Sequence, residues 1–254
     1  MSTPHGKVDL DHTKTLLQQL GLAEATQLLE PLLTEASKDN LSLHRFLDKI
    51  LGAEYQHREE RRIITSLRLS GLPSGMSLKS FDFAFQPGID KNRIETLATC
   101  GYIRQQETIL LQGPPGIGKT HLAVALGVKA VENGFSVAYF RLDDLLHALK
   151  QDAEQAPTRL KSKKYLKVAL LIINELGFQT LSRQEAALLF RLVNYRYQRG
   201  STIITTNKAI KDWPEILAGD EVMATALLDR LLHHCHVLNI KGRSFRLKEV
   251  LAAS

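Results

Sequence analysis

A run of eight residues in the middle of the chain has the types and spacing of a phosphate-binding loop. Residues 113–120 read Gly-Pro-Pro-Gly-Ile-Gly-Lys-Thr and match G-x-x-x-x-G-K-[ST]. Glycines let the backbone curl until successive amides face phosphate oxygens, and a helix that begins there adds the positive end of its dipole. We expect Lys119 to reach the β and γ phosphates of ATP and the Thr120 hydroxyl to hold Mg²⁺. A chance glycine-rich turn is the alternative, but a strand before the loop and a helix after it favour a nucleotide site.

A second polar pair follows an apolar strand. Residues 170–173 are apolar, and Asn174 and Glu175 come directly after them. Open α/β sheets bind ligands at the carboxyl edge of their strands, so this pair is expected beside the loop. In P-loop ATPases the first position is normally an Asp that orients the Mg²⁺ shell, and the second is a Glu that activates the attacking water. An amide brings no negative charge, so we expect ATP binding to persist and Mg²⁺-dependent hydrolysis to be slower than with Asp. The alternative is that the pair only ends a strand.

Two further residues are candidates for contact with the γ-phosphate. Asn207 follows a predicted strand and is expected to help place the attacking water, although Asn is also a common turn residue. Arg230 lies in the helix before the last predicted strand, where ring-forming ATPases present an Arg finger to the neighbouring subunit. An ion pair with Asp229, or exposure to solvent, is the alternative for Arg230.

The predicted site therefore combines catalytic, nucleotide-binding and metal-binding residues. The catalytic residues are Glu175, Asn207 and Arg230, and Mg²⁺ is expected on Thr120 and, through water, on Asn174. The nucleotide contacts are Gly113, Pro114, Pro115, Gly116, Ile117, Gly118, Lys119, Thr120, His121 and Asn174.

The elements that must position these residues follow from hydrophobic periodicity. Leucine spacing over residues 10–69 is helical, with breaks at Gly21 and at residues 38–42, so three helices are expected. Residues 70–87 have the composition of a connector, in which Phe81, Phe83 and Phe85 alternate and are expected to pack against an edge of the following core. Strands are expected at 108–112, 136–141, 168–173, 201–206 and 236–240, and helices at 120–132, 143–150, 185–199 and 223–233.

Alternation of short apolar strands with helices predicts a fold class. It is typical of an α/β three-layer sandwich with a mostly parallel sheet, here preceded by a small all-α domain. We expect a helical N-terminal domain at 1–70, a linker and leading helix at 71–106, and an ATPase domain at 107–254.

Composition limits the setting. The chain has 254 residues, of which 44% are hydrophobic and 24% charged, and a net charge of +6 that favours a polyanionic partner. Cys100 and Cys235 are far apart and without metal-ligand spacing, and the histidines at 233, 234 and 236 lack a completing Cys or carboxylate cluster, so neither a disulfide framework nor a metal site is expected there. No stretch approaches the roughly 20 apolar residues of a membrane span, so we expect a cytoplasmic protein without membrane contact.

Basic residues crowd the segment before the apolar strand. This cluster could neutralise several phosphates of double-stranded DNA, although a charge run is often only a solvated face. No helix-turn-helix or zinc-finger spacing occurs, so little base-specific readout is expected. The candidate DNA contacts are Arg159, Lys161, Lys163, Lys164 and Lys167.

Taken together, the pattern resembles the IstB-like ATPases, AAA+ helper proteins of insertion-sequence transposition that are similar to the bacterial helicase loader DnaC. The resemblance covers nearly the whole chain and rests on residues 58–62, 81–87, 113–123, 200–207, 228–234 and 240–247. It implies a P-loop AAA+ fold and a homo-oligomer that assembles on double-stranded DNA with ATP, deforms it and presents it to a transposase. The sequence departs from the family pattern at position 174, where it has Asn and the family has Asp.

Three functions are compatible with this sequence. The first is an ATP-gated DNA-binding assembly that assists a transposase. The second is a helicase loader whose main partner is a replicative helicase, and a metabolic P-loop kinase ranks last because no second substrate pocket is evident from the sequence.

Overall fold

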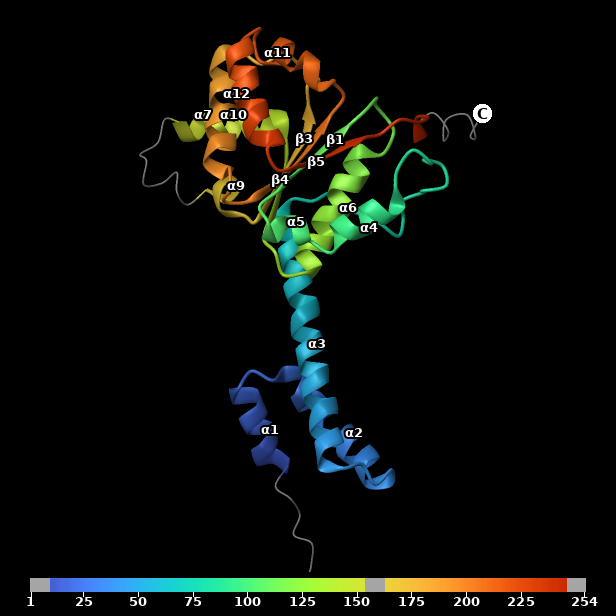
Figure 1. Cartoon of the computed structure of the whole chain (residues 1–254). Helices are drawn as coiled ribbons and strands as arrows, with labels where there is room; N and C mark the ends of the chain where they lie inside the picture. The colour runs from blue at the N-terminus through green and yellow to red at the C-terminus, as the bar shows by residue number, and fades with distance from the viewer. Residues whose placement is uncertain (1–9, 154–162, 246–254) are drawn as a thin grey trace, which may run out of the picture. The chain divides into compact units, whose positions relative to one another are not determined.

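A computed structural model describes residues 10–153 and 163–245, so the candidate DNA contacts Arg159 and Lys161 lie outside the described residues. Contacts between residues divide the chain into two compact units, Met1–Thr65 and Ser66–Ser254. Figure 1 shows the elements of both units along the chain. None of the described helices is long and apolar enough to cross a membrane.

The N-terminal unit is helical, as the leucine spacing predicts. Helices α1 (Leu10–Gln19) and α2 (Ala23–Lys38) are followed by α3 (Leu43–Ser70), which begins in this unit. Ala25, Leu29 and Leu32 lie at helical spacing on α2 and form a small buried core with Ile50 of α3.

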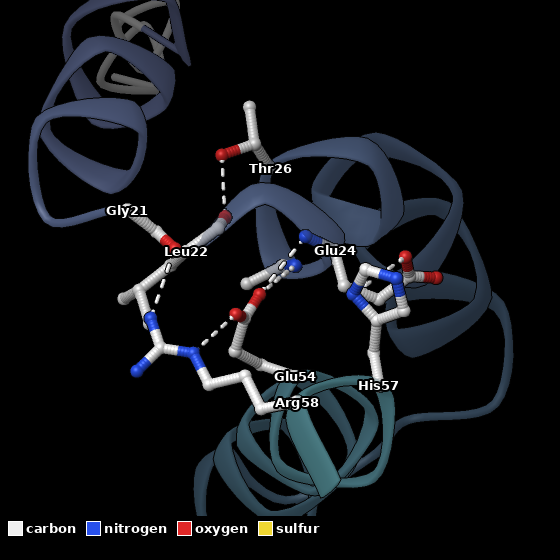
Figure 2. Close-up of polar contacts among 8 residues, drawn as sticks. Gly21, Leu22, Glu24, Thr26, Glu54, His57 and Arg58 are labelled. Carbon is white, nitrogen blue, oxygen red and sulfur yellow. Dashed lines mark hydrogen bonds and ion pairs between the residues drawn. The ribbon is translucent and has the colours of Figure 1, made fainter. Parts of the chain in front are cut away.

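A buried carboxylate connects two of these helices (Figure 2). The N-cap residue of α2, Leu22, provides no side-chain hydrogen bond. Instead, Glu54 of α3, which is only 4% exposed, accepts hydrogen bonds at Oε2 from the backbone N–H groups of Glu24 (2.9 Å) and Ala25 (3.1 Å). Arg58 donates from Nε to Oε1 of the same carboxylate at 2.8 Å and from Nη2 to the Gly21 carbonyl at 2.9 Å. Glu54 therefore satisfies backbone donors at the start of α2 that would otherwise be unpaired.

The second unit is built on a five-stranded sheet. The strands are β1 (Thr108–Gln112), β2 (Val137–Arg141), β3 (Leu170–Leu176), β4 (Ser201–Thr206) and β5 (Cys235–Asn239), in the order β2-β3-β4-β1-β5. All four pairings are parallel, so the carboxyl ends of the strands meet at one edge. The mostly parallel sheet predicted from the sequence is confirmed.

Helices cover both faces of this sheet (Figure 1). A hydrophobic cluster joins one face to α7 (Leu142–Ala153), α10 (Arg183–Arg196), α11 (Trp213–Ile216) and α12 (Glu221–Leu232). On the other face α6 (Lys119–Glu132) contacts β1, β2, β3 and β4, and α4 (Lys91–Ala98) packs on α6. The short helices α5 (Gly101–Arg104) and α9 (Lys164–Lys167) precede β1 and β3, and a 3₁₀ turn at Ile210–Asp212 precedes α11. The result is the predicted three-layer arrangement.

Several element boundaries differ by one to three residues from the sequence prediction, among them the ends of α10 and β3. Helix α10 ends at Arg196 rather than at 199, and Ser182 and Glu185 form a capping box at its start. Strand β3 continues to Leu176, three residues past its predicted end, because the chain bulges there and resumes pairing when Leu176 meets Thr206 of β4. Asn174 and Glu175 consequently lie within the strand, at the bulge.

Candidate nucleotide-binding site

The phosphate-binding loop lies where the sequence predicts it, between β1 and α6. Gly118 is the N-cap of α6 and has a φ of 96°, a left-handed conformation that glycine adopts without strain. A Cβ atom at this position would also lie 2.7 Å from the ring of Phe81. The loop therefore needs glycine at position 118 both for its turn and for close approach of the preceding connector.

Lys119 is held inside this loop. Its side chain is 8% exposed, and its Nζ donates to the carbonyl oxygens of Gly113 and Pro114, each at 2.7 Å. The loop thus places the ammonium group at its own centre, where it can compensate phosphate charge.

Asn174 joins the loop to the sheet. Its Oδ1 accepts hydrogen bonds from the hydroxyls of Thr120 and Thr205, both at 2.8 Å, and the residue is 2% exposed. The structure therefore brings Thr120 and Asn174 together, as the motif spacing predicts. The Thr120 hydroxyl and the Asn174 amide oxygen are suitable ligands for a hard cation such as Mg²⁺ or for its bound water, but the amide contributes no negative charge.

Glu175 lies beside Asn174 in a strained conformation. Its φ is 70°, which is rare for a residue other than glycine, and its backbone N–H donates to the Thr205 hydroxyl at 2.9 Å. Its carboxylate forms an ion pair with Nε of Arg141 at 3.2 Å, and the two side chains are 33% and 61% exposed. Arg141 ends β2, the neighbour of β3, so the predicted base is partnered by a residue that sequence spacing did not identify.

A cavity of ≈ 290 Å³ extends from the loop toward the connector. Lys119, Thr120 and Glu175 line one part, and Phe81, Gln86 and Phe245 line another. The Phe81 ring meets His121 edge-on at 5.2 Å, and the Phe85 ring meets Phe245 at 5.4 Å. Phe81 thus packs against α6 of the core, as expected for the connector, and also lines the cavity, whereas Phe85 contacts the C-terminal segment.

The C-terminal segment completes this wall. The backbone N–H of Phe245 donates to the Gly116 carbonyl at 2.8 Å, and the Gln86 side chain donates from Nε2 to the Arg243 carbonyl at 2.7 Å. The phosphate-binding loop, the connector and the C-terminal segment thus all contribute to the cavity. The loop lies at one end, and aromatic rings and the Gln86 amide lie at the other. Such a shape and chemistry fit a nucleotide with its base against the rings.

The two remaining catalytic candidates stand apart from this cavity. Asn207 follows β4 and does not line the cavity, and its Oδ1 is buried without a hydrogen-bond partner among the described residues. Arg230 donates from Nε to Asn194 Oδ1 at 2.7 Å and lies over the Phe190 ring at 5.1 Å. It is therefore anchored on α10 and is not paired with Asp229.

The described members of the predicted DNA-contact cluster lie at the opposite edge of the sheet, before the first residue of β3. Nζ of Lys163 pairs with Asp152 Oδ1 at 2.5 Å, and Nζ of Lys164 donates to the Leu69 carbonyl. Lys167 is exposed. Internal partners thus occupy two of these three lysines.

A phosphate-binding loop after β1, a polar pair on the buried strand β3 and a 2-3-4-1-5 parallel sheet define a P-loop AAA+ fold. Solved structures agree: the DnaC helicase loader superposes with a TM-score of 0.54 at 24% identity over 65% of this chain and 97% of that one. AMPPCP-bound DnaA from Aquifex aeolicus superposes with a TM-score of 0.52 at 19% identity over 72% of this chain and 56% of that one. These likenesses describe the fold alone.

The sequence relatives are more specific. Residues 15–253 match the model of the IstB-like ATP binding protein family, and the chain belongs to that family. It is 42% identical to the insertion sequence IS21 ATP-binding protein of Pseudomonas aeruginosa over 93% of this chain and 89% of that protein. It is also 41% identical to the IS5376 ATP-binding protein of Geobacillus stearothermophilus over 84% of this chain and 85% of that protein. The resemblance seen in the sequence is confirmed.

Proposed function

We propose that this protein is an ATPase that assembles on double-stranded DNA in an ATP-dependent way, deforms the duplex and assists a partner transposase. The observation that carries the proposal is the convergence of Lys119, Thr120, Asn174 and Glu175 at one end of a nucleotide-sized cavity. The names of its relatives, ATP-binding proteins of insertion sequences, support the link to transposition.

ATP hydrolysis at this site is proposed to be slow. Bound Mg²⁺ supplies positive charge that neutralises the β and γ phosphates. Thr120 and Asn174 are the residues to hold the ion and its water, and Glu175 is the base that accepts a proton from the attacking water as the bond to the leaving ADP breaks. Asn174 adds no charge, and the ion pair with Arg141 engages the base, so both features oppose rapid turnover.

Assembly is proposed to couple the nucleotide to DNA. Arg230 would leave Asn194 and reach the phosphates of a neighbouring subunit, while Asn207 would orient the attacking water. A repeated array of basic surfaces, to which Lys163, Lys164 and Lys167 contribute, would then follow the duplex backbone through phosphate contacts. Lys163 and Lys164 must exchange their internal partners for phosphate in this arrangement.

The test is duplex affinity measured with ATP, with ADP and without nucleotide across a salt series. We expect binding that requires ATP, weakens steeply with salt and hardly varies with sequence, because phosphate contacts carry no sequence information. Tight binding by a nucleotide-free monomer, or no duplex binding in any condition, contradicts the proposal.

A helicase loader is the second candidate, favoured by the match to 97% of the DnaC chain. Its main partner would be a replicative helicase, and its DNA contact would be secondary. Purified helicase and purified transposase, each offered to the ATP-bound protein, discriminate the two functions by which one is retained.

A further inference from the structure

A second, smaller cavity opens at the amino edge of the sheet, away from the phosphate-binding loop. We call it the amino-edge recess, and it is lined among others by Arg196, Arg230, His234, Gln105 and Gln198. Its volume is ≈ 30 Å³, enough for about one or two water-sized groups. Arg196, Arg230 and His234 are basic residues of its lining, and no carboxylate of the described residues lines it. The Arg230 guanidinium itself donates to Asn194 and to the Ala226 carbonyl, which lie outside the lining.

Arg196 gives this recess its charge. Its side chain is 3% exposed, and its donors meet only neutral acceptors: Nη1 donates to the carbonyls of Tyr165 (3.1 Å) and Val168 (3.0 Å), and Nη2 to that of Ser201 (2.6 Å). Nε is 3.4 Å from the Thr202 hydroxyl. Burial lowers the pKa of Arg196 to about 10. A buried cation without a counter-charge is costly, so an anion at the recess would stabilise it.

One donor of this guanidinium remains for a ligand. A guanidinium has five N–H groups, and the four hydrogen bonds above account for four, which leaves one on Nη2. Gly200, which also lines the recess, faces this atom: a Cβ on Gly200 would lie 2.8 Å from Nη2. The absence of a side chain at position 200 therefore keeps space open beside Nη2.

We propose that the amino-edge recess binds a phosphate group, with one phosphate oxygen inserted toward Arg196 and with Arg230 and His234 at the mouth. The small volume admits an oxygen and leaves the rest of the phosphate outside, as suits a phosphate attached to a larger molecule. Two sources present this chemistry: the backbone of duplex DNA and the nucleotide of a second copy of this chain. The choice of sources rests on the proposed function, whereas the phosphate site itself does not.

Position also connects the recess with the proposed DNA surface. Arg196 donates to the carbonyls of Tyr165 and Val168, and these residues flank Lys167, an exposed lysine of the predicted DNA-contact cluster. A backbone phosphate in the recess would thus have a further cation on the adjoining segment.

Inorganic phosphate is the first probe, in a Lys119→Ala background so that the phosphate-binding loop does not take up the anion. Gln198→Glu places a carboxylate at the recess, and Gln184→Glu makes the same charge change at an exposed site on α10. Phosphate at about ten times its Kd should raise the unfolding midpoint by roughly 3 °C in the background and with Gln184→Glu. The rise should disappear with Gln198→Glu. An equal rise in all three proteins, or none in any, overturns the proposal.

Duplex DNA and ATP then distinguish the sources, with Lys119 intact. If the phosphate comes from DNA, Gln198→Glu should lower duplex affinity and reduce the slope of log affinity against log salt by about 1, the loss of one contact. If it comes from a second copy's nucleotide, the variant should weaken ATP-dependent sedimentation as an oligomer without DNA. If the unmodified chain binds DNA and assembles with ATP, but Gln198→Glu changes neither property relative to Gln184→Glu, the proposal is overturned. If the unmodified chain does neither, the proposed function is contradicted and the inorganic phosphate titration alone decides whether the recess binds phosphate.

Discussion

Replacement of Glu54 by Gln tests how the N-terminal helices hold together. Gln has nearly the same shape, so packing is preserved, and its single carbonyl oxygen can still accept from the amides of Glu24 and Ala25. Its NH₂ group then faces Nε of Arg58, whose hydrogen bond the Glu54 carboxylate accepts at 2.8 Å, so that hydrogen bond is lost. Loss of a hydrogen bond to a charged group costs about 1.5–3 kcal/mol.

Hydrogen exchange of the α2 amides in the full-length chain measures this cost locally. Because 1.4 kcal/mol is a factor of ten, protection of the α2 amides should fall by roughly 10- to 100-fold, while protection in the second unit is unchanged. Unchanged α2 protection would show that the Glu54 carboxylate does not stabilise this helix.

Lowering the pH tests the same contact in a second way. Burial alone would raise the Glu54 pKa, but hydrogen bonds from Ala25, Arg58 and Glu24 outweigh it and hold the pKa below its ordinary value of 4.5. A carboxyl whose folded pKa is depressed contributes stability above its unfolded pKa, and that stability is lost as the pH falls through the folded value. The difference in α2 protection between the unmodified chain and Glu54→Gln should therefore shrink below about pH 4.5.

Three predictions concern the nucleotide site. Lys119→Ala should abolish binding of a fluorescent ATP analogue, because the ammonium held by the Gly113 and Pro114 carbonyls is lost; unchanged affinity would remove the assignment of the loop. Asn174→Asp should raise Mg²⁺-dependent phosphate release at saturating ATP by about tenfold or more, equivalent to about 1.4 kcal/mol, since it restores charge beside Thr120; equal rates would show that this position does not limit the chemistry. Arg141→Ala should raise turnover by at most about fivefold, because a half-exposed ion pair contributes about 1 kcal/mol or less, and a fall in turnover would show that Arg141 assists the reaction.

Local pattern was sufficient to predict most of the fold and the placement of the loop and of the Asn174–Glu175 pair at one edge of the sheet. The loop at 113–120 and the strand before Asn174 carry their own signals, and a parallel sheet brings both to one edge. Partners set by tertiary register were not predictable: Arg141 meets Glu175 only because β2 lies beside β3. Gln86 and Arg243 are separated by 157 residues.

The burial of two charged side chains could not be predicted from the sequence either. Arg196 and Glu54 look like surface residues of charged helices, and nothing in their spacing indicates that one contacts backbone carbonyls and the other caps α2. Their environments depend on where a neighbouring segment begins or ends.

Sedimentation velocity of the protein with labelled duplex DNA in ATP tests the central claim most directly. The proposed function predicts that the unmodified chain forms a large DNA-bound species, which Lys119→Ala abolishes through loss of nucleotide. Arg230→Ala should reduce assembly and DNA binding together while a single subunit still binds ATP. Assembly on DNA that is the same with and without ATP, or that is unaffected by both substitutions, would contradict it.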